Sequence, residues 1–406
     1  MKFTKRFGAL ALALALSLSA LTGCGGGGSS SVGAASSSGT GSSSSGSSSG
    51  SGQIEPMDLS QVTDPVEAVC GLARDTVVAN VGQAQVTADE LLYWMVNGVN
   101  LNLSQSGGVE LPWDLELEGG GTLSDSFKES ALEVAAFYAL LPQKAQAEGI
   151  TEISQETQDQ LAQLRDSYLG KLGSEKMVDY YFLAGGMADW NTFTALNHKA
   201  DLLTQLQKAY FGEGSEGYPT DAEVLAFAQD ELGAFRVKHI LLMTMDQATR
   251  EPLDEAAAAE KKTLAEDLLA QLRESADPIA LFDQLMNQYS EDGGLATNPD
   301  GYVFDSTASL VGGFREATLA LEVGQISDLV ETDYGYHIML RLPLDPADYR
   351  EKAVAWRMQE KSDLWLEEAG VETTQAYDQL NLAQIWPQYQ ALQKAAYEQV
   401  NNVLGN

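Results

Sequence analysis

Two short segments, 235–242 and 330–342, constrain the fold of this chain more than any other feature of the sequence. Both are rich in β-branched and aromatic residues, a composition that predicts β-strands. Each predicted strand carries one of the three histidines of the chain, His239 and His337. The sequence therefore predicts a small sheet with a histidine on each of two strands.

The residues between these strands show both helical and strand-like patterns. Residues 254–275 are rich in Ala, Leu, Glu and Lys and predict one long helix. An aspartate followed by a proline predicts the start of a second helix over 278–289. A short helix is expected at 313–321, and further strands are expected near Tyr302 and Ile326. These elements predict an α+β module in which helices cover a small, mainly antiparallel sheet.

Four sequence blocks between the strands point to a known family. In chain order they are QYSEDGG at 288–294, NPDGYVF at 298–304, GFREATLAL at 313–321 and EVGQIS at 322–327. Their order and spacing resemble those of the parvulin family of peptidyl-prolyl isomerases. The resemblance covers residues 234–344 and implies an isomerase domain that acts on X-Pro bonds.

The resemblance implies three residues at the centre of the isomerase site. His239 and His337 correspond to the family's two central-strand histidines, and Asp292 corresponds to a position held by aspartate or cysteine. Each has a structural alternative, because the histidines can hydrogen-bond to hold the sheet and Asp292 can cap a turn. Direct catalysis and electrostatic tuning by the histidines are equal alternatives. The three residues fit the ligand types of a metal site, but their spacing matches no metal motif, so no metal is expected.

Five further residues are expected to bind the substrate by the same resemblance. Leu310 and Phe314 correspond to the hydrophobic pair of the proline pocket. The family's usual Gly-Gly-Asp-Leu-Gly-aromatic loop is replaced by NPDGYVF, so Tyr302 or Phe304 is expected to supply a pocket wall. Tyr334 falls where the family often has a small hydroxyl residue. Alternatively, Phe314 belongs to the hydrophobic core.

The chemistry of prolyl isomerisation needs few reactive groups. Rotation about the prolyl amide has a barrier of about 18 to 20 kcal/mol and breaks no bond. Catalysis therefore requires no nucleophile, metal or cofactor, but rather an apolar slot for the ring and polar groups that hold the flanking carbonyls. The acidic stretch after the first strand, 245–255, implies no preference for phosphorylated substrates.

Residues 1–24 are typical of a bacterial lipoprotein signal peptide. A basic start precedes an apolar run over 7–20, which is too short to span a bilayer stably. The sequence LTGC at 21–24 resembles a lipobox, so Cys24 is expected to carry a lipid such as palmitate and to anchor the chain. The expected location is the extracytoplasmic face of a bacterial cell membrane. The alternative is an ordinary secretory signal with an incidental cysteine.

Composition restricts both the linker and the partners of the chain. Residues 25–55 are mostly Gly and Ser and are expected to form a flexible linker. The 58 acidic and 24 basic residues give a net charge of -34, so nucleic acid and anionic lipid are poor partners. A halophile-like surface is the alternative interpretation of this charge. If Cys24 is lipidated, Cys70 has no partner, so no disulfide is expected.

Helical patterns dominate the two flanks of the module, at 56–233 and 345–406. Thr-x-x-Glu capping boxes at Thr87 and Thr220 predict helix starts, and Pro142 predicts a kink. The layout resembles the PrsA and SurA group of extracytoplasmic foldases, in which the flanks form one chaperone domain that contains the inserted isomerase module. The expected partners are unfolded or partly folded exported polypeptides with X-Pro bonds, and a homodimer is left open.

Two functions of different class follow from these patterns. One is a lipid-anchored isomerase that speeds the folding of exported proteins. The other is a holdase whose parvulin module is inactive and whose helical domain cradles unfolded chains. A solute-binding lipoprotein would need alternating βα units, which this chain lacks.

Overall fold

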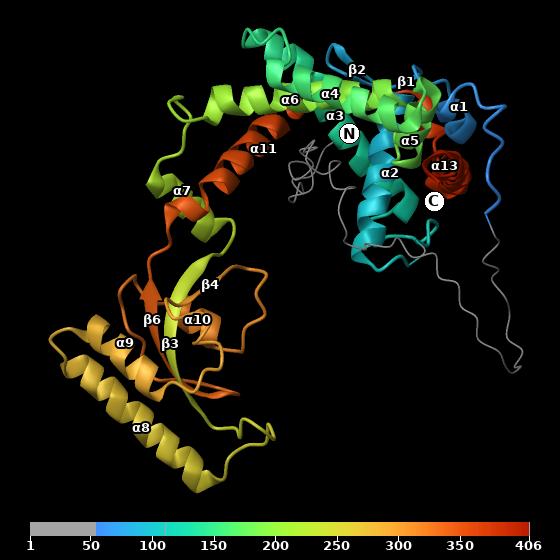
Figure 1. Cartoon of the computed structure of the whole chain (residues 1–406). Helices are drawn as coiled ribbons and strands as arrows, with labels where there is room; N and C mark the ends of the chain where they lie inside the picture. The colour runs from blue at the N-terminus through green and yellow to red at the C-terminus, as the bar shows by residue number, and fades with distance from the viewer. Residues whose placement is uncertain (1–53, 110, 406) are drawn as a thin grey trace, which may run out of the picture. The chain divides into compact units, whose positions relative to one another are not determined.

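The computed structural model describes residues 54–109 and 111–405, which divide into two compact units (Figure 1). The first unit combines the described residues up to Glu216 with those from Arg357 onward. The second unit spans Gly217–Trp356. The chain therefore leaves the first unit once, forms the second unit, and returns.

Helices make up most of the first unit, and a three-stranded sheet joins its two segments. The helices are α1 (Pro65–Cys70), α2 (Ala88–Gln105), α3 (Leu123–Ala147), α4 (Gln155–Leu172), α5 (Glu175–Ala184), α6 (Trp190–Phe211), α12 (Gln375–Asp378), α13 (Leu382–Leu404) and most of α11 (Arg350–Ala369). The sheet has the order β2 (Ala84–Thr87), β1 (Val77–Val81), β7 (Val371–Thr373). Antiparallel pairing places Val371 of β7 opposite Val81 of β1. A strand from the C-terminal flank thus completes a sheet begun in the N-terminal flank.

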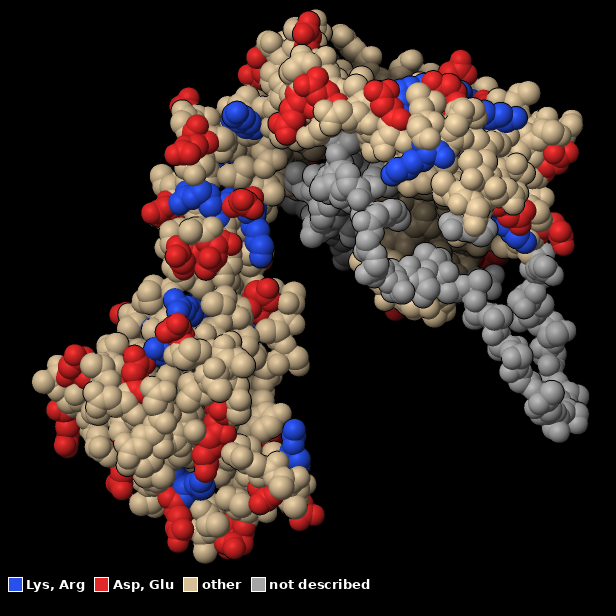
Figure 2. All heavy atoms as spheres, in the orientation of Figure 1, with Lys and Arg blue, Asp and Glu red and all other residues tan. Residues whose placement is uncertain are grey.

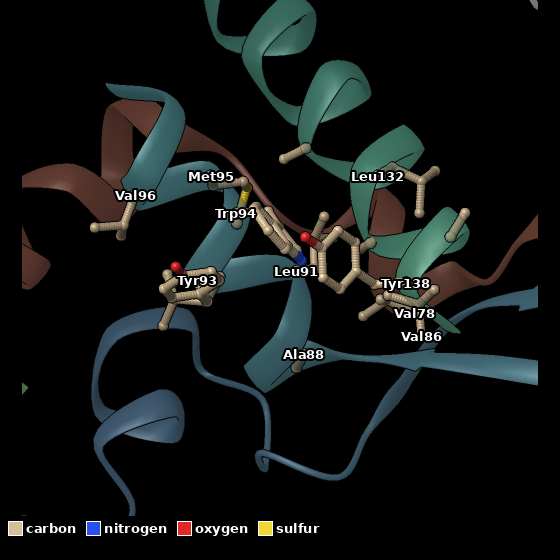
Figure 3. Packing of buried hydrophobic residues seen from close by; sticks show 14 of the residues in the cluster. Val78, Val86, Ala88, Leu91, Tyr93, Trp94, Met95, Val96, Leu132 and Tyr138 are labelled. Atoms are coloured by element: carbon tan, nitrogen blue, oxygen red, sulfur yellow. The ribbon is translucent and has the colours of Figure 1, made fainter. Parts of the chain in front are cut away.

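One hydrophobic core holds the first unit together. Figure 3 shows Leu91 and Trp94 of α2 beside Tyr138 of α3. The ring centroids of Trp94 and Tyr138 are 4.7 Å apart. Helix α13 adds Ile385 and Leu392 to the same cluster, and burial of each such side chain stabilises the fold by about 1.5 to 3 kcal/mol. The prediction that the two flanks form one helical domain is therefore confirmed.

The second unit is an α+β module built on a four-stranded antiparallel sheet, as predicted. The strand order is β4 (Tyr302–Phe304), β3 (Phe235–Met243), β6 (Gly335–Leu342), β5 (Val330–Thr332). Its helices are α7 (Asp221–Asp230), α8 (Glu255–Glu274), α9 (Pro278–Tyr289) and α10 (Phe314–Leu319), with a 3-10 turn at Pro346–Asp348. Phe227 and Tyr349 pack together beyond the sheet. This unit is therefore wider than 234–344 at both ends.

The expectation of one strand over 330–342 is wrong, because the structure divides this segment into the hairpin β5–β6. The turn ends at Gly335, whose φ is 139°. A Cβ atom at Gly335 would lie 2.2 Å from the Leu242 carbonyl oxygen, so the close pairing of β6 with β3 requires glycine there. The strand predicted near Ile326 is reduced to a single bridge with Leu340.

The two faces of this sheet have different partners. Ile240 of β3 and Ile338 of β6 belong to a core cluster with residues of α8 and α9. Met339 belongs to a separate cluster with α10 on the other face. Because side chains alternate along a strand, His239 and His337 lie on the α10 face.

The predicted helix starts are confirmed in part. Thr220 forms a complete capping box at the start of α7. At the start of α2, the Thr87 side chain accepts the N–H of Glu90, but the Glu90 carboxylate pairs with Lys199 instead of reaching back. This second box is therefore half formed. Helix α3 continues through Pro142 as a single element.

Acidic side chains outnumber basic ones on the visible surfaces of both units (Figure 2). Figure 2 shows Asp and Glu side chains spread over the visible surface with few Lys and Arg side chains between them, in keeping with the net charge of -34. Among the residues that the structure describes, no helix combines the length and hydrophobicity needed to cross a bilayer. Cys24, the rest of the predicted signal peptide and most of the predicted linker lie outside the described residues.

Removal of residues 357–406 tests the shared core of the first unit. The truncation deletes β7 and α13, which supply a strand of the sheet and buried residues such as Leu382. We expect the cooperative transition of the first unit to be lost, whereas the second unit keeps its whole sheet and still unfolds cooperatively. Scanning calorimetry of the truncated and full-length chains measures both transitions. Two transitions at the full-length temperatures would contradict the shared core.

Candidate active site

One pocket of about 570 Å³ lies on the sheet face that carries the two histidines. All eight side chains for which the sequence predicted a catalytic or substrate-binding role line this pocket. They are His239, Asp292, Tyr302, Phe304, Leu310, Phe314, Tyr334 and His337. The fold therefore brings together residues from three strands, one helix and three connecting segments.

The two histidines meet because of the register between β3 and β6. His239 pairs with Met339 and Leu241 pairs with His337, so the histidines are diagonal neighbours on one face. Their rings are stacked at 15° with centroids 5.3 Å apart, and the two Nδ1 atoms are 3.1 Å apart. A side-chain hydrogen bond therefore links the two central strands.

Asp292 lies on a loop that is tied to β3. The backbone N–H of Glu291 donates to the Leu241 carbonyl oxygen at 2.8 Å, and the Leu241 N–H donates to Ser290 Oγ at 3.1 Å. The Glu291 carboxylate accepts the backbone N–H of Met243 at 2.8 Å. These three hydrogen bonds fix the loop beside β3 and place Asp292 next to the histidine pair.

Three donors hold the Asp292 carboxylate. Its Oδ2 atom lies 3.2 Å from His239 Nε2 and also accepts the Tyr302 hydroxyl, whereas Oδ1 accepts the Gly294 N–H at 3.1 Å. The hydrogen bonds from His239, Tyr302 and Gly294 outweigh the effect of burial and hold the pKa of Asp292 well below its usual range. Asp292 is therefore ionised, and it can only accept hydrogen bonds.

Thr332 contacts the second histidine, His337, and so ends the hydrogen-bonded series Asp292–His239–His337–Thr332. Its Oγ1 atom is 2.8 Å from His337 Nε2 and accepts the backbone N–H of Tyr334 at 3.2 Å. The Gly335 carbonyl oxygen is a more distant acceptor for the hydroxyl, at 3.4 Å. The Thr332 hydroxyl therefore donates to His337. Tyr334 itself lies at the pocket rim with 39% of its surface exposed.

Burial decides the protonation of His337, and the hydrogen bonds of the pair then place the remaining protons. Burial lowers the pKa of His337 to about 3, so His337 is neutral near pH 7. Because the Thr332 hydroxyl donates to its Nε2 atom, the neutral His337 ring carries its proton on Nδ1 and donates it to His239 Nδ1. His239 therefore accepts at Nδ1 and donates from Nε2 to the ionised Asp292.

These shifted pKa values link the stability of the second unit to pH. His337 gains a proton near pH 6.5 in the unfolded chain but only near pH 3 in the folded one, so stability is lost as the pH falls between these values. The lowered pKa of Asp292 contributes stability that is present above its unfolded value of 3.8 and is lost below it. As the pH falls, protonation of His337 therefore destabilises the second unit before protonation of Asp292 does.

Phe314 forms the apolar wall of the pocket at the start of α10. Its side chain is buried, and its ring packs edge-on against the rings of His239 and His337, with centroid distances of 5.3 and 5.4 Å. Leu310 and Phe304 are partly buried beside it. The pocket therefore combines an apolar slot with an immobilised carboxylate. In the described ranges, no group of three or more His, Cys, Asp or Glu side chains is arranged to hold a metal ion.

Two residues had no counterpart in the sequence predictions: Thr332, which contacts His337, and Arg250, which lines the pocket. Thr332 pairs with Gly335 across the β5–β6 hairpin, which places it beside His337. This contact is visible in the sequence only if 330–342 is divided into two strands. Arg250 lines the pocket on a turn after β3, and its φ of 62° is the only positive φ of a non-glycine residue within the described parts of the chain.

Comparison with known proteins places this pocket in a family. Residues 226–340 match the family model described as the PPIC-type PPIASE domain. The foldase protein PrsA of Geobacillus sp. (strain WCH70) is 34% identical over 120 residues, which cover 30% of this chain and 36% of the relative. The chaperone SurA of Chromobacterium violaceum is 23% identical over 297 residues, which cover 68% of this chain and 65% of the relative.

The solved structures include a similar protein. The crystal structure of the peptidylprolyl isomerase PrsA from Bacillus cereus is 18% identical, and the match covers 67% of this chain and 97% of that chain with a TM-score of 0.31. The matches to the Geobacillus and Chromobacterium relatives span less than two thirds of the relatives' own lengths. Residues 226–340 belong to the PPIC-type, or parvulin, family of peptidyl-prolyl isomerase domains, within a chain similar to the foldases PrsA and SurA.

Proposed function

We propose that this protein is a peptidyl-prolyl cis-trans isomerase that assists the folding of exported proteins. Its substrates are unfolded or partly folded polypeptides that contain X-Pro bonds. The main support is the pocket in which Phe314 lies beside the hydrogen-bonded Asp292 and the histidine pair. The similarity to proteins named foldase and chaperone agrees with this function.

The pocket favours a twisted prolyl amide over a planar one. The proline ring packs against Phe314 and Leu310, which are apolar and already ordered. In the planar amide, resonance places negative charge on the carbonyl oxygen, and this charge decreases when the bond is twisted. The ionised Asp292 on the pocket wall disfavours the more charged planar form and so promotes rotation. A binding preference of about 5 kcal/mol for the twisted form accelerates rotation several thousand-fold.

The histidine pair acts by positioning and not by proton transfer. Rotation about the amide makes and breaks no bond, so the reaction needs no acid or base. His239 holds the Asp292 carboxylate through Nε2, and both histidine rings support the face of the pocket on which Phe314 lies. Their neutral state keeps the negative charge of Asp292 from being cancelled by an adjacent cation.

A holdase without isomerase activity is the second candidate. The first unit exposes large apolar side chains, as a surface that binds unfolded chains requires. Within the described residues they are Ile54, Val109, Leu115, Leu364, Tyr397, Val403 and Leu404. A holdase does not depend on the pocket of the second unit, so changes in this pocket separate the two candidates.

The substitution Phe314→Ala tests the isomerase function. It removes an apolar wall worth about 2 to 3 kcal/mol of contact, part of which is expressed in the twisted state. We expect kcat/KM for a proline-containing peptide to fall at least about ten-fold, while suppression of client aggregation is unchanged. The matched control is Ile279→Ala, because Ile279 is exposed on α9 outside the pocket.

Two results would count against the isomerase. If the wild-type protein suppresses aggregation but shows no isomerase activity, the holdase is favoured. If Phe314→Ala and Ile279→Ala isomerise the peptide at equal rates while both remain folded by circular dichroism, the proline ring does not bind beside Phe314.

We also infer that a lipid on Cys24 holds the protein at the extracytoplasmic face of a bacterial membrane. Support comes from the sequence alone: a basic start, an apolar run over 7–20 and the lipobox-like LTGC at 21–24. A linker of the length and composition of 25–55 gives a mean reach on the order of 30 Å. Such a reach lets the folded units meet clients beyond the membrane surface.

The substitution Cys24→Ala tests this anchor in cells. We expect the wild-type protein to enter the detergent phase and the variant to become soluble or to remain unprocessed, because the thiol that accepts the lipid is absent. Cys70→Ala, which changes the only other cysteine, serves as the control and should partition like the wild type. Unchanged detergent partitioning of Cys24→Ala would argue against lipidation.

A further inference from the structure

We propose that Tyr302 is a positioning residue that holds the Asp292 carboxylate in the orientation used for isomerisation. This role rests on the proposed function, because the orientation matters only if the pocket acts on a prolyl amide. The sequence suggested only that Tyr302 forms part of a pocket wall. The structure adds a hydrogen bond from its hydroxyl to Asp292 Oδ2, the oxygen that also faces His239 Nε2.

The Tyr302 ring is held on two sides. On β4, Tyr302 pairs with Val237 of β3, which fixes its backbone beside the central strand. Its ring lies parallel to that of Phe304, at 4° with centroids 5.6 Å apart, and meets the His239 ring at 64° and 5.6 Å. The phenol is therefore restrained toward Asp292 before any substrate arrives.

Gly294 provides the space that this hydroxyl occupies. A Cβ atom at Gly294 would lie 2.3 Å from the Tyr302 hydroxyl oxygen, which is closer than any non-bonded contact allows. The Gly294 N–H also donates to Asp292 Oδ1. Gly294 therefore leaves room for the Tyr302 hydroxyl to reach Asp292 Oδ2, and its own N–H binds Asp292 Oδ1.

Three donors on two oxygens define the plane of the Asp292 carboxylate. His239 and Tyr302 bind Oδ2, and Gly294 binds Oδ1, so rotation of the carboxylate breaks at least one hydrogen bond. Burial and the adjacent Asp292 raise the pKa of Tyr302 above its usual range, so the phenol keeps the proton that it donates.

The other charged groups nearby are directed elsewhere. The Glu291 carboxylate binds the Met243 N–H and pairs with Lys261. His337 is separated from Asp292 by the His239 ring, which it contacts through Nδ1. Arg250 lines the same pocket and has no hydrogen bond or ion pair to Asp292 among the described contacts. Tyr302 and His239 are thus the two side chains that orient this carboxylate.

The substitution Tyr302→Phe removes the hydroxyl and leaves the ring in the pocket wall. We expect kcat to fall about three- to ten-fold, with KM changed by less than about two-fold, because the lost hydrogen bond orients Asp292 but does not bind the ring. The carboxyl carbon of Asp292, followed by ¹³C NMR, should begin to titrate at higher pH than in the wild type. The control Tyr336→Phe removes a phenol from the opposite face of the sheet and should change neither quantity.

Gly294→Ala gives an independent test with the phenol present. Its methyl group should displace the Tyr302 hydroxyl and raise the pH at which Asp292 titrates, as Tyr302→Phe does. Adding Gly294→Ala to Tyr302→Phe should have a smaller effect on this titration than Gly294→Ala has alone, because the 2.3 Å contact is already absent.

Several results would overturn the positioning role. One is an Asp292 titration in Tyr302→Phe equal to that in Tyr336→Phe. Another is a Tyr302→Phe variant in which KM rises but kcat is unchanged, since Tyr302 would then bind substrate as part of the pocket wall without orienting Asp292. If Tyr302→Phe does not fold, an unshifted Asp292 titration in folded Gly294→Ala overturns the role instead. The NMR titrations need no turnover, so they decide the positioning of Asp292 even if the wild-type protein proves inactive as an isomerase.

Discussion

The hydrogen bond between the Nδ1 atoms of His239 and His337 is the contact on which the rest of the pocket depends. It forms only when β3 and β6 are antiparallel neighbours in the observed register. A slip of one residue would send one histidine to the α8 and α9 face of the sheet. Gly335 secures this register, because any side chain there would collide with the carbonyl oxygen of Leu242. Sheet pairing and pocket chemistry are therefore set by the same backbone contacts.

Among the residues that the structure describes, no lysine or arginine pairs with the Asp292 carboxylate. Hydrogen bonds stabilise Asp292, whereas the nearby Lys261 pairs with the neighbouring Glu291. An ion pair at Asp292 would cancel the charge that acts on the substrate amide, and neutral histidines leave that charge in place. The hydrogen bonds from His239, Tyr302 and Gly294 offset the cost of partly burying this carboxylate. The net charge of -34 over the whole chain favours solubility.

Strong local patterns made much of this fold predictable from sequence. The two histidine strands, the helices α8 and α9 and the helical flanks all follow from composition, periodicity and capping. Blocks in a recognisable order selected eight side chains that the structure places around one pocket. Alternation along β3 and β6 explains why both histidines reach it.

The contacts that could not be predicted join residues whose proximity leaves no recognisable motif in the nearby sequence. The β5–β6 turn contains Asp333 and Tyr334, which is not one of the usual two-residue hairpin pairs, so the hairpin and the role of Thr332 were missed. The hydrogen bond from Tyr302 to Asp292 joins two ends of an irregular loop. At the start of α2, Lys199 competes for the glutamate of a capping box from a helix far away in sequence.

The protonation of the two histidines is the central claim of this account, and ¹⁵N NMR of the imidazole rings in the full-length protein at pH 7 tests it most directly. We expect two neutral rings of opposite tautomer, with the proton on Nε2 of His239 and on Nδ1 of His337. Loss of the Asp292 acceptor in Asp292→Ala should then alter the His239 signals first. A doubly protonated His239, or a His337 ring with its proton on Nε2, would contradict the account.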